Sequence, residues 1–216
     1  MKKIFKTLIL SLVIINLSSA QNIDHSFFMS VEDFLNKNIS NGLVNYSGLQ
    51  SDKSLDNLIL QIAEADLTQA DAKTKQAFYI NAYNLIVIDQ VRKSYPLTSV
   101  QSKGGFCDRN KTMIAGENLT LNQLEKNKLL KTYGDARFHF VLVCGAVDCP
   151  PLADFAYSPE NLDEQLQERT QSAINDENFI YEEKGIAYIS EIFKWYVQDF
   201  GNSSKKVLEY INSFRE

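Results

Sequence analysis

The residues best suited to chemistry gather between positions 139 and 149, where one histidine and two cysteines occur. A thiol becomes a nucleophile when a neighbouring imidazole removes its proton, and the imidazole needs a carboxylate or an amide to orient it. Residues 137–144 are predicted to form a strand that is apolar on both faces, which would place His139 and Cys144 on opposite sides. Cys149 lies beyond a glycine at which the chain can turn back, so it is the better partner for His139.

These residues predict a thiol-dependent catalytic site. Cys149 would be the nucleophile and His139 the general base, while Glu125, on a predicted preceding helix, would orient the imidazole ring. Cys144 and Asp148 would bind substrate or organise the loop around Cys149. Chemistry of this kind cleaves or transfers amide and ester bonds, including those of peptides and wall fragments.

Each of these residues also has a structural interpretation, and the sequence leaves both open. Cys144 at the end of an apolar segment is compatible with a small buried hydrophobe, or with a short disulfide to Cys149. His139 stands between two phenylalanines and is compatible with a core histidine. The two cysteines and the histidine resemble part of a zinc site, but a second ligand pair is missing. We therefore predict neither a metal nor a cofactor.

Two asparagines interrupt the most apolar helix predicted in the chain, residues 71–93. Asn81 and Asn84 lie three residues apart, on one face of that helix. A buried amide without a partner costs about 1–3 kcal/mol, so each asparagine must find one. They would either hydrogen-bond the backbone of the loop at 145–152 or help to bind substrate. The same choice applies to three residues near the C-terminus, Trp195, Tyr196 and Asp199.

The elements that must position these residues are mostly helical. Apolar spacing and capping residues predict helices from about residue 30, over 54–65 and over 71–93, and several more nearer the C-terminus. The later ones include a helix that begins at Ser190 and stops at Gly201, and a last one over 204–214. Residues 179–182 and 186–189 flank a short turn and predict a β-hairpin. Strands are few and do not alternate with helices, so the fold class is helix-rich α+β, with a small, mostly antiparallel sheet.

The N-terminus has the pattern of a secretory signal peptide over residues 1–20. Three lysines precede a short apolar run, and small residues stand at positions 18 and 20. The remaining residues, 21–216, are predicted to form one globular domain of an exported protein, periplasmic or secreted, with no membrane span after cleavage. The net charge of the whole chain is −5 and becomes more negative when the three lysines leave, which argues against binding of nucleic acid. The expected partner is a small-molecule or peptide ligand.

Several blocks, taken in order, resemble the family called domain of unknown function 547. They comprise residues 77–84, 116–125, 139–151 and 160–166, and the Phe-Lys-Trp-Tyr and Asp-Phe-Gly motifs within 192–201. The resemblance extends over residues 46–201 and implies one fold unit. Members of the family occur as exported bacterial proteins, and its name records no established activity.

Two functions from different classes follow from the sequence. The first is a thiol-dependent hydrolase or acyl transferase that acts on amide or ester bonds. The second is a non-catalytic binding or scaffold module, in which the polar cluster is structural. A thiol in a pocket beside His139 would favour the first function.

Overall fold

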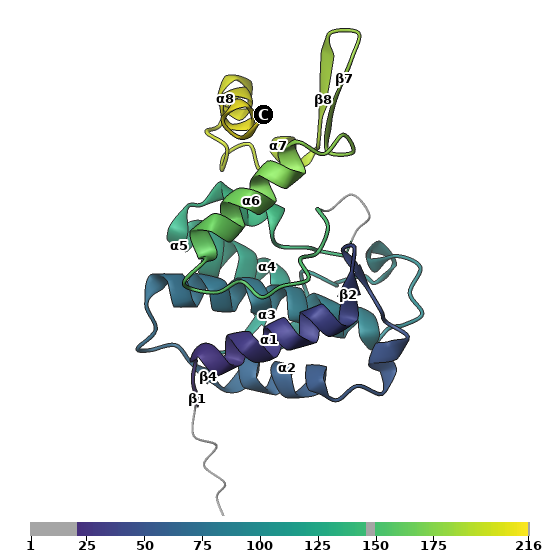
Figure 1. Ribbon diagram of the computed structural model, residues 1–216, viewed down its shortest axis with the longest axis vertical. Coiled ribbons are helices and arrows are strands. Elements are labelled where there is room, and N and C mark those ends of the chain that lie inside the picture. The colour runs from purple at the N-terminus through teal and green to yellow at the C-terminus, as the bar shows by residue number, and fades with distance from the viewer. Residues whose placement is uncertain (1–20, 146–149, 216) are drawn as a thin grey trace, which may run out of the picture.

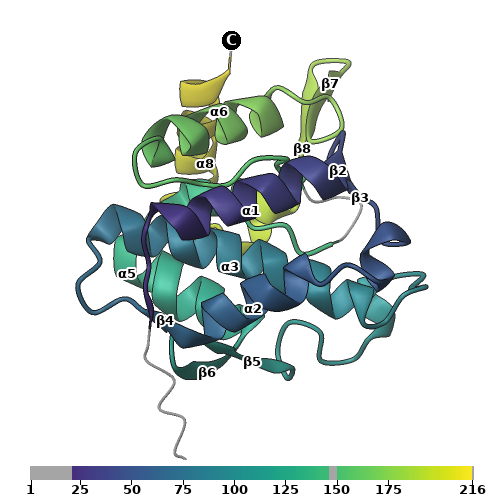
Figure 2. The ribbon, with the colours of Figure 1, turned by 60° about the horizontal axis from the view of Figure 1, so that its bottom comes forward.

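The computed structural model describes residues 21–145 and 150–215. The predicted signal peptide, residues 1–20, lies outside the described residues, and so do Asp148 and Cys149. The predicted fold class is confirmed, because helices dominate and the described strands form small two-stranded pairs. Figures 1 and 2 both show α1, α2 and α3 together in the body of the molecule, with α6, α8 and the β7–β8 hairpin gathered at one end.

The longer helices form the frame of the molecule. They are α1 (His25–Asn38), α2 (Ser54–Glu64), α3 (Ala72–Arg92), α6 (Leu162–Ile174) and α8 (Ser204–Phe214). Shorter helical pieces are α4 (Leu121–Gln123), a π-helical stretch (Leu124–Leu130), α5 (Lys131–Tyr133), a 3₁₀ helix (Ala136–Phe140) and α7 (Ile192–Trp195). Two further 3₁₀ turns occupy Gly48–Gln50 and Val100–Ser102.

The described strands pair locally and do not join into one sheet. Three pairs are antiparallel: β2 (Ile39–Ser40) with β3 (Leu43–Val44), β5 (Lys111–Ile114) with β6 (Glu117–Thr120), and β7 (Ile180–Glu183) with β8 (Ile186–Ile189). One pair is parallel, β1 (Gln21–Asn22) with β4 (Ala65–Asp66). The predicted hairpin is therefore confirmed, with its first strand shifted by one residue.

Helix α3 is the central helix, as its sequence predicts. Asp71 caps its N-terminus by accepting a hydrogen bond from the backbone N–H of Thr74, and every residue from Ala77 to Asp89 is buried. A helix that is apolar on all sides must be covered on all sides. Helices α1, α2 and the π-helical stretch supply that cover, and together they form what we call the α3 core.

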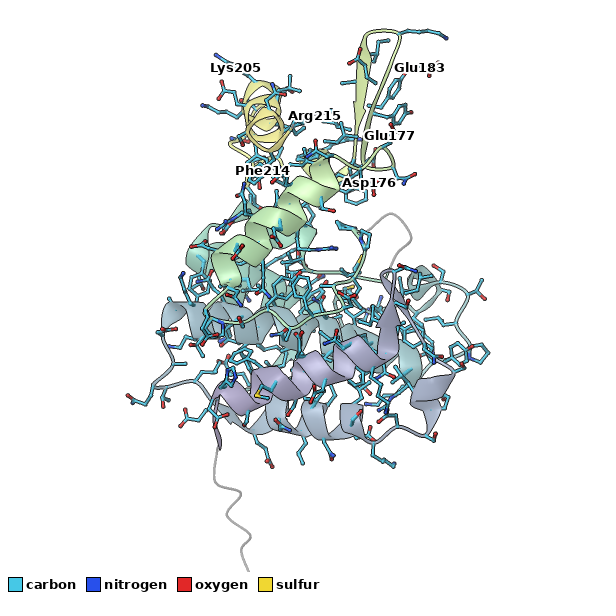
Figure 3. The ribbon with its side chains drawn as sticks, viewed as in Figure 1. Asp176, Glu177, Glu183, Lys205, Phe214 and Arg215 are labelled. Carbon is cyan, nitrogen blue, oxygen red and sulfur yellow. The ribbon has the colours of Figure 1, made fainter. Side chains whose placement is uncertain are left out.

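A second, smaller core lies at the C-terminal end of the chain. Its buried members include four phenylalanines with ring centroids 4.8–6.1 Å apart: Phe140, Phe179, Phe193 and Phe200. Helices α6 and α8 complete this C-terminal aromatic cluster. The hairpin β7–β8 projects beyond it, and Figure 3 marks the hairpin by Glu183 and α8 by Lys205.

Two helix predictions were wrong at their boundaries. Helix α1 begins at His25, earlier than the predicted start near residue 30, because Asp24 caps it through the backbone N–H of Ser26. The helix predicted from Ser190 to Gly201 is only the short α7, and the chain continues to Gly201 in turns. These turns place Tyr196 and Asp199 next to His139.

The predicted strand over residues 137–144 was also wrong. The chain forms the 3₁₀ helix Ala136–Phe140, which Asp135 caps through the backbone N–H of Arg137, and then continues without regular structure. With three residues per turn, successive side chains of a 3₁₀ helix point in three directions. Phe138 enters the α3 core and Phe140 the C-terminal aromatic cluster, while His139 lines a pocket between them.

Candidate functional site

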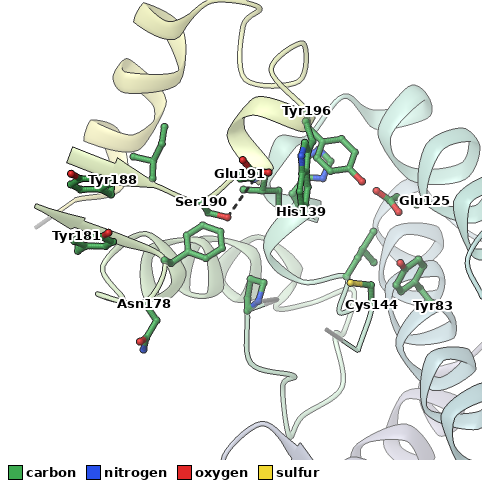
Figure 4. A pocket seen from close by; sticks show the side chains of 16 residues that line it. Tyr83, Glu125, His139, Cys144, Asn178, Tyr181, Tyr188, Ser190, Glu191 and Tyr196 are labelled. Atoms are coloured by element: carbon green, nitrogen blue, oxygen red, sulfur yellow. Dashed lines mark hydrogen bonds between the residues drawn. The ribbon is translucent and has the colours of Figure 1, made fainter. Parts of the chain in front are cut away.

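A pocket lies where the α3 core meets the C-terminal aromatic cluster. It has a volume of about 630 Å³ and is shown in Figure 4. The α3 core contributes residues that include Tyr83, Glu125 and Cys144, and the C-terminal part of the chain contributes the hairpin, α7 and Tyr196. Its other lining residues are His139, Leu142, Pro150, Asn178, Phe179, Tyr181, Tyr188, Ile189, Ser190, Glu191, Ile192 and Trp195.

His139 is buried at the junction of the two cores, and its side chain is only 2% exposed. Its Nε2 lies 2.9 Å from Oδ2 of Asp199, and its ring lies against that of Tyr196 with centroids 4.0 Å apart. Burial lowers the pKa of His139, and the nearby Asp199 carboxylate offsets only part of that effect. The imidazole is therefore neutral at pH 7, which is the form a general base requires.

The contact with Asp199 also fixes which ring nitrogen carries the proton. A carboxylate accepts hydrogen bonds and does not donate them, so Nε2 bears the hydrogen and Nδ1 keeps its lone pair. Asp199 does not line the main pocket; it lines a neighbouring cavity with Arg137 and Tyr210. Nε2 thus points towards that cavity, and the opposite edge of the ring, with Nδ1, is turned away from it.

Glu125 does not bond to His139 in the described contacts, although the sequence predicts that it orients the ring. It lies in the π-helical stretch and accepts a hydrogen bond from the hydroxyl of Tyr196, which separates it from His139 in Figure 4. Burial raises the pKa of Glu125. The carboxylate on His139 belongs to Asp199, sixty residues further along the chain, so the orienting role predicted for Glu125 falls to Asp199.

The described thiols differ in their surroundings. Cys144 is partly exposed and lines the pocket together with His139. Cys107 is outside the pocket lining, and burial, followed by the nearness of Cys144 and Glu125, raises its pKa to about 11. Cys107 is therefore a protonated, unreactive thiol at neutral pH. Cys149, the predicted nucleophile, and Asp148 lie outside the described residues, so their predicted roles stay predictions.

The two asparagines of α3 hold backbone segments on either side of residues 145–152. The Asn84 side chain donates to the carbonyl of Val141 at 2.9 Å and accepts from the N–H of Val143 at 3.0 Å. Asn81 makes the same pair of bonds with Tyr157, at 2.7 and 3.1 Å. The predicted bonds to loop backbone are therefore present, but their partners flank the predicted loop. Neither asparagine lines the pocket.

The chain that leads away from Pro150 is also tied down. The Arg169 guanidinium of α6 donates to the carbonyl of Pro151, and Glu32 of α1 accepts from the N–H of Ala156. Asn81 of α3 bonds to Tyr157 in the same segment, so residues of α1, α3 and α6 together hold it in place. The backbone on both sides of the pocket wall is thus held by side-chain hydrogen bonds, most of which are buried or partly buried.

Sequence reasoning missed the aromatic wall of the pocket and the partner of His139. Tyr181 and Tyr188 carry no motif, and only their alternation on a hairpin shows that they share a face. Tyr196 and Asp199 stand out in the sequence, but nothing local connects them with His139. The π-helical stretch that carries Glu125 has no signal in the apolar pattern, although such stretches often occur at functional sites.

Two kinds of feature are absent from residues 21–145 and 150–215. No group of three or more His, Cys, Asp or Glu side chains is arranged to hold a metal ion. No helix within the same residues combines the length and apolar character needed to cross a membrane.

The chain matches the family described as Protein of unknown function, DUF547, over residues 67–173. This confirms the resemblance inferred from the motifs for that span, which contains His139, Glu125, Cys144 and both buried asparagines. The hairpin, Tyr196 and Asp199 lie beyond the match. No curated protein and no solved structure matches the chain. Function must therefore be argued from the site.

Proposed function

We propose that the protein is a thiol-dependent hydrolase or acyl transferase that acts on amide or ester bonds in the pocket at the junction of its two cores. The observation that carries this proposal is that His139, which is paired with Asp199, lines the same cavity as a partly exposed thiol, Cys144. A thiol, a neutral imidazole and a carboxylate that orients it are the parts of a nucleophilic acyl-transfer site.

Cys144 is the nucleophile that the described residues support. A regular strand would have separated Cys144 from His139, and that strand is not formed. Both residues line the same pocket. Cys149 remains the alternative nucleophile predicted from the sequence, and the experiment below includes it.

Acylation and release require only these groups and water. Nδ1 of His139 takes the proton of the Cys144 thiol, and the sulfur attacks the carbonyl carbon of the substrate. The imidazolium gives that proton to the leaving amine or alcohol as the carbon–nitrogen or carbon–oxygen bond breaks, which leaves a thioester. The imidazole then takes a proton from water, the hydroxide attacks the thioester carbonyl, and the imidazolium returns the proton to the departing sulfur as the acid is released. With another acceptor in place of water, the reaction is a transfer.

Hydrolysis of p-nitrophenyl acetate by the folded, reduced protein tests the proposal. We expect Cys144→Ser to abolish release of p-nitrophenol, and Asp199→Asn to slow it by about 10²–10⁴-fold, as for other losses of an acid–base function. Cys107→Ser is the matched control, because its thiol stays protonated, and it should leave the rate unchanged. Circular dichroism of each variant establishes that it has folded.

The outcomes separate the candidates. Activity that survives in Cys144→Ser and disappears in Cys149→Ser would transfer the role of nucleophile to Cys149. A wild-type protein that neither hydrolyses the ester nor reacts with iodoacetamide at either cysteine would refute the enzyme and favour the non-catalytic binding module. The partial exposure of the aromatic wall is the observation that supports that second function.

A further inference from the structure

Three large aromatic side chains at the pocket are exposed to solvent. They are Tyr181 and Tyr188 on the hairpin, 46% and 42% exposed, and Trp195 on α7, 69% exposed. All three line the pocket, and we call them the aromatic platform. Exposed apolar side chains that gather at one site indicate a surface for binding.

The two tyrosines of the platform stack on each other. Tyr181 and Tyr188 face each other across the two strands, with ring centroids 4.7 Å apart and planes within 5° of parallel. The strands that carry them contribute little to either core, since every residue of β8 is exposed and only Ile180 of β7 is buried. Burial in the protein therefore does not explain these aromatic residues, whereas contact with a ligand does.

The charge of the pocket indicates which ligand. Among its described lining residues two are carboxylates, Glu125 and Glu191, and none is a lysine or an arginine. The nearest cation on α7, Lys194, lies 3.5 Å from Glu191 but lines a different groove, with Phe193 and Val207. An aromatic wall with carboxylates and no cation attracts a positive charge, both through the ring faces and through Coulomb interaction.

We propose that the aromatic platform binds the ammonium group of a positively charged peptide, such as a lysine side chain, and so selects cationic amides as substrates of this pocket. The substrate class rests on the proposed function, whereas the binding step does not. A cation over a tyrosine or tryptophan face changes affinity by about 2- to 30-fold. Cys144 lies across the pocket from Tyr181 and Tyr188 in Figure 4, so a bound peptide would extend from the ammonium group towards the thiol.

Binding at the platform can be measured by intrinsic fluorescence, because Trp195 is the only tryptophan in the chain. Its fluorescence is followed while N-acetyl-lysine amide is added to the Cys144→Ser variant, which prevents turnover. N-acetyl-norleucine amide is the matched probe that lacks only the ammonium group. We expect saturable quenching by the lysine probe, binding at least about tenfold weaker for the norleucine probe, and weaker lysine binding in high salt.

Two tyrosine variants identify the place of binding. Tyr188→Leu should weaken lysine binding by about tenfold, because it removes one ring face of the platform. Tyr95→Leu is the control: Tyr95 is 44% exposed, stacks on Tyr46 with centroids 6.1 Å apart, and does not line this pocket. It should leave binding unchanged.

Equal affinity for the two probes, or equal effects of the two tyrosine variants, would overturn the proposal. Binding of a neutral oligosaccharide in place of the lysine probe would also overturn it and assign the platform to a glycan. Lysine binding in a protein that hydrolyses no ester would refute the proposed function and keep the platform. Ester hydrolysis without lysine binding would support the proposed function and refute the role of the platform.

Discussion

The α3 core and the C-terminal aromatic cluster are built differently, and the pocket lies between them. The α3 core is large, with mainly aliphatic side chains around a helix that is buried from Ala77 to Asp89. The C-terminal aromatic cluster is small and depends on a few rings in tilted or edge-to-face contact, and the hairpin beside it is largely exposed. The first supplies Cys144 and Glu125, and the second supplies Asp199, Tyr196 and the aromatic platform.

This difference shows how the site can be both fixed and accessible. The backbone near Cys144 is held by Asn84 of the most buried helix, so the thiol has a rigid support. Tyr181 and Tyr188, on the other side, belong to a hairpin with few buried residues, and such elements open at lower free energy than the rest of a protein. His139 joins the two regions, because its neighbours Phe138 and Phe140 are anchored in different cores.

The largest expected effects come from removing one buried ring from each region. Phe78 and Phe140 are both fully buried, so Phe78→Ala and Phe140→Ala should each cost about 3–5 kcal/mol of unfolding free energy. Phe140→Ala should loosen the C-terminal part first, with faster amide hydrogen exchange over residues 179–214 and little change in α3. Phe78→Ala should raise exchange throughout. Equal acceleration in α3 by both variants would show that the two regions unfold as one unit.

A smaller loss is expected when the support of the thiol is removed. Asn84→Ala leaves the carbonyl of Val141 and the N–H of Val143 without their partner, which should cost about 1–3 kcal/mol. Thermal or urea unfolding measures this loss. Asn36→Ala is the control, because Asn36 is exposed on α1 and bonds only to Glu32 among the contacts described. Unchanged stability in Asn84→Ala would contradict the supporting role of α3.

The pH dependence of stability should report the burial of His139. Its pKa is lowered in the folded state, so below about pH 6.5 the unfolded chain binds the proton more readily than the native one. The stability that this residue contributes is therefore complete above that pH and is lost as the pH falls through the folded-state pKa. Urea unfolding between pH 7 and 5 should show a shallower decline for His139→Gln than for the wild type. His25→Gln, at an exposed position, is the control, and an equal decline in both variants would refute the assignment.

The smallest effect has the opposite sign. Burial raises the pKa of Glu125 above its ordinary 4.5, so its ionised form costs stability once the pH exceeds the folded-state pKa. Glu125→Gln should then melt at a higher temperature than the wild type at pH 7 to 8, and the difference should vanish below pH 4.5. Glu160→Gln, on the surface, should show no such gain. A lower melting temperature for Glu125→Gln at neutral pH would mean that the contact with Tyr196 requires the charge.

The sequence determined those features that depend on local pattern. The apolar periodicity and Asp71 define α3, Thr120 and Gln123 form a capping box at α4, and alternation around a tight turn defines the β7–β8 hairpin. A helix so uniformly apolar must be central, so its polar side chains are buried and need hydrogen-bond partners. The sequence therefore also predicted that Asn81 and Asn84 bond to backbone groups.

Tertiary structure decided the site. The apolar run over residues 137–144 fits a strand or a buried turn equally well, and only packing against two separate cores selects the 3₁₀ helix that turns His139 into the pocket. Asp199 and His139 are sixty residues apart, and no periodicity relates them. Local sequence patterns specify which face of an element is apolar. The partner of a polar side chain depends instead on how distant elements pack. In this protein that packing places Asp199, rather than Glu125, in contact with His139.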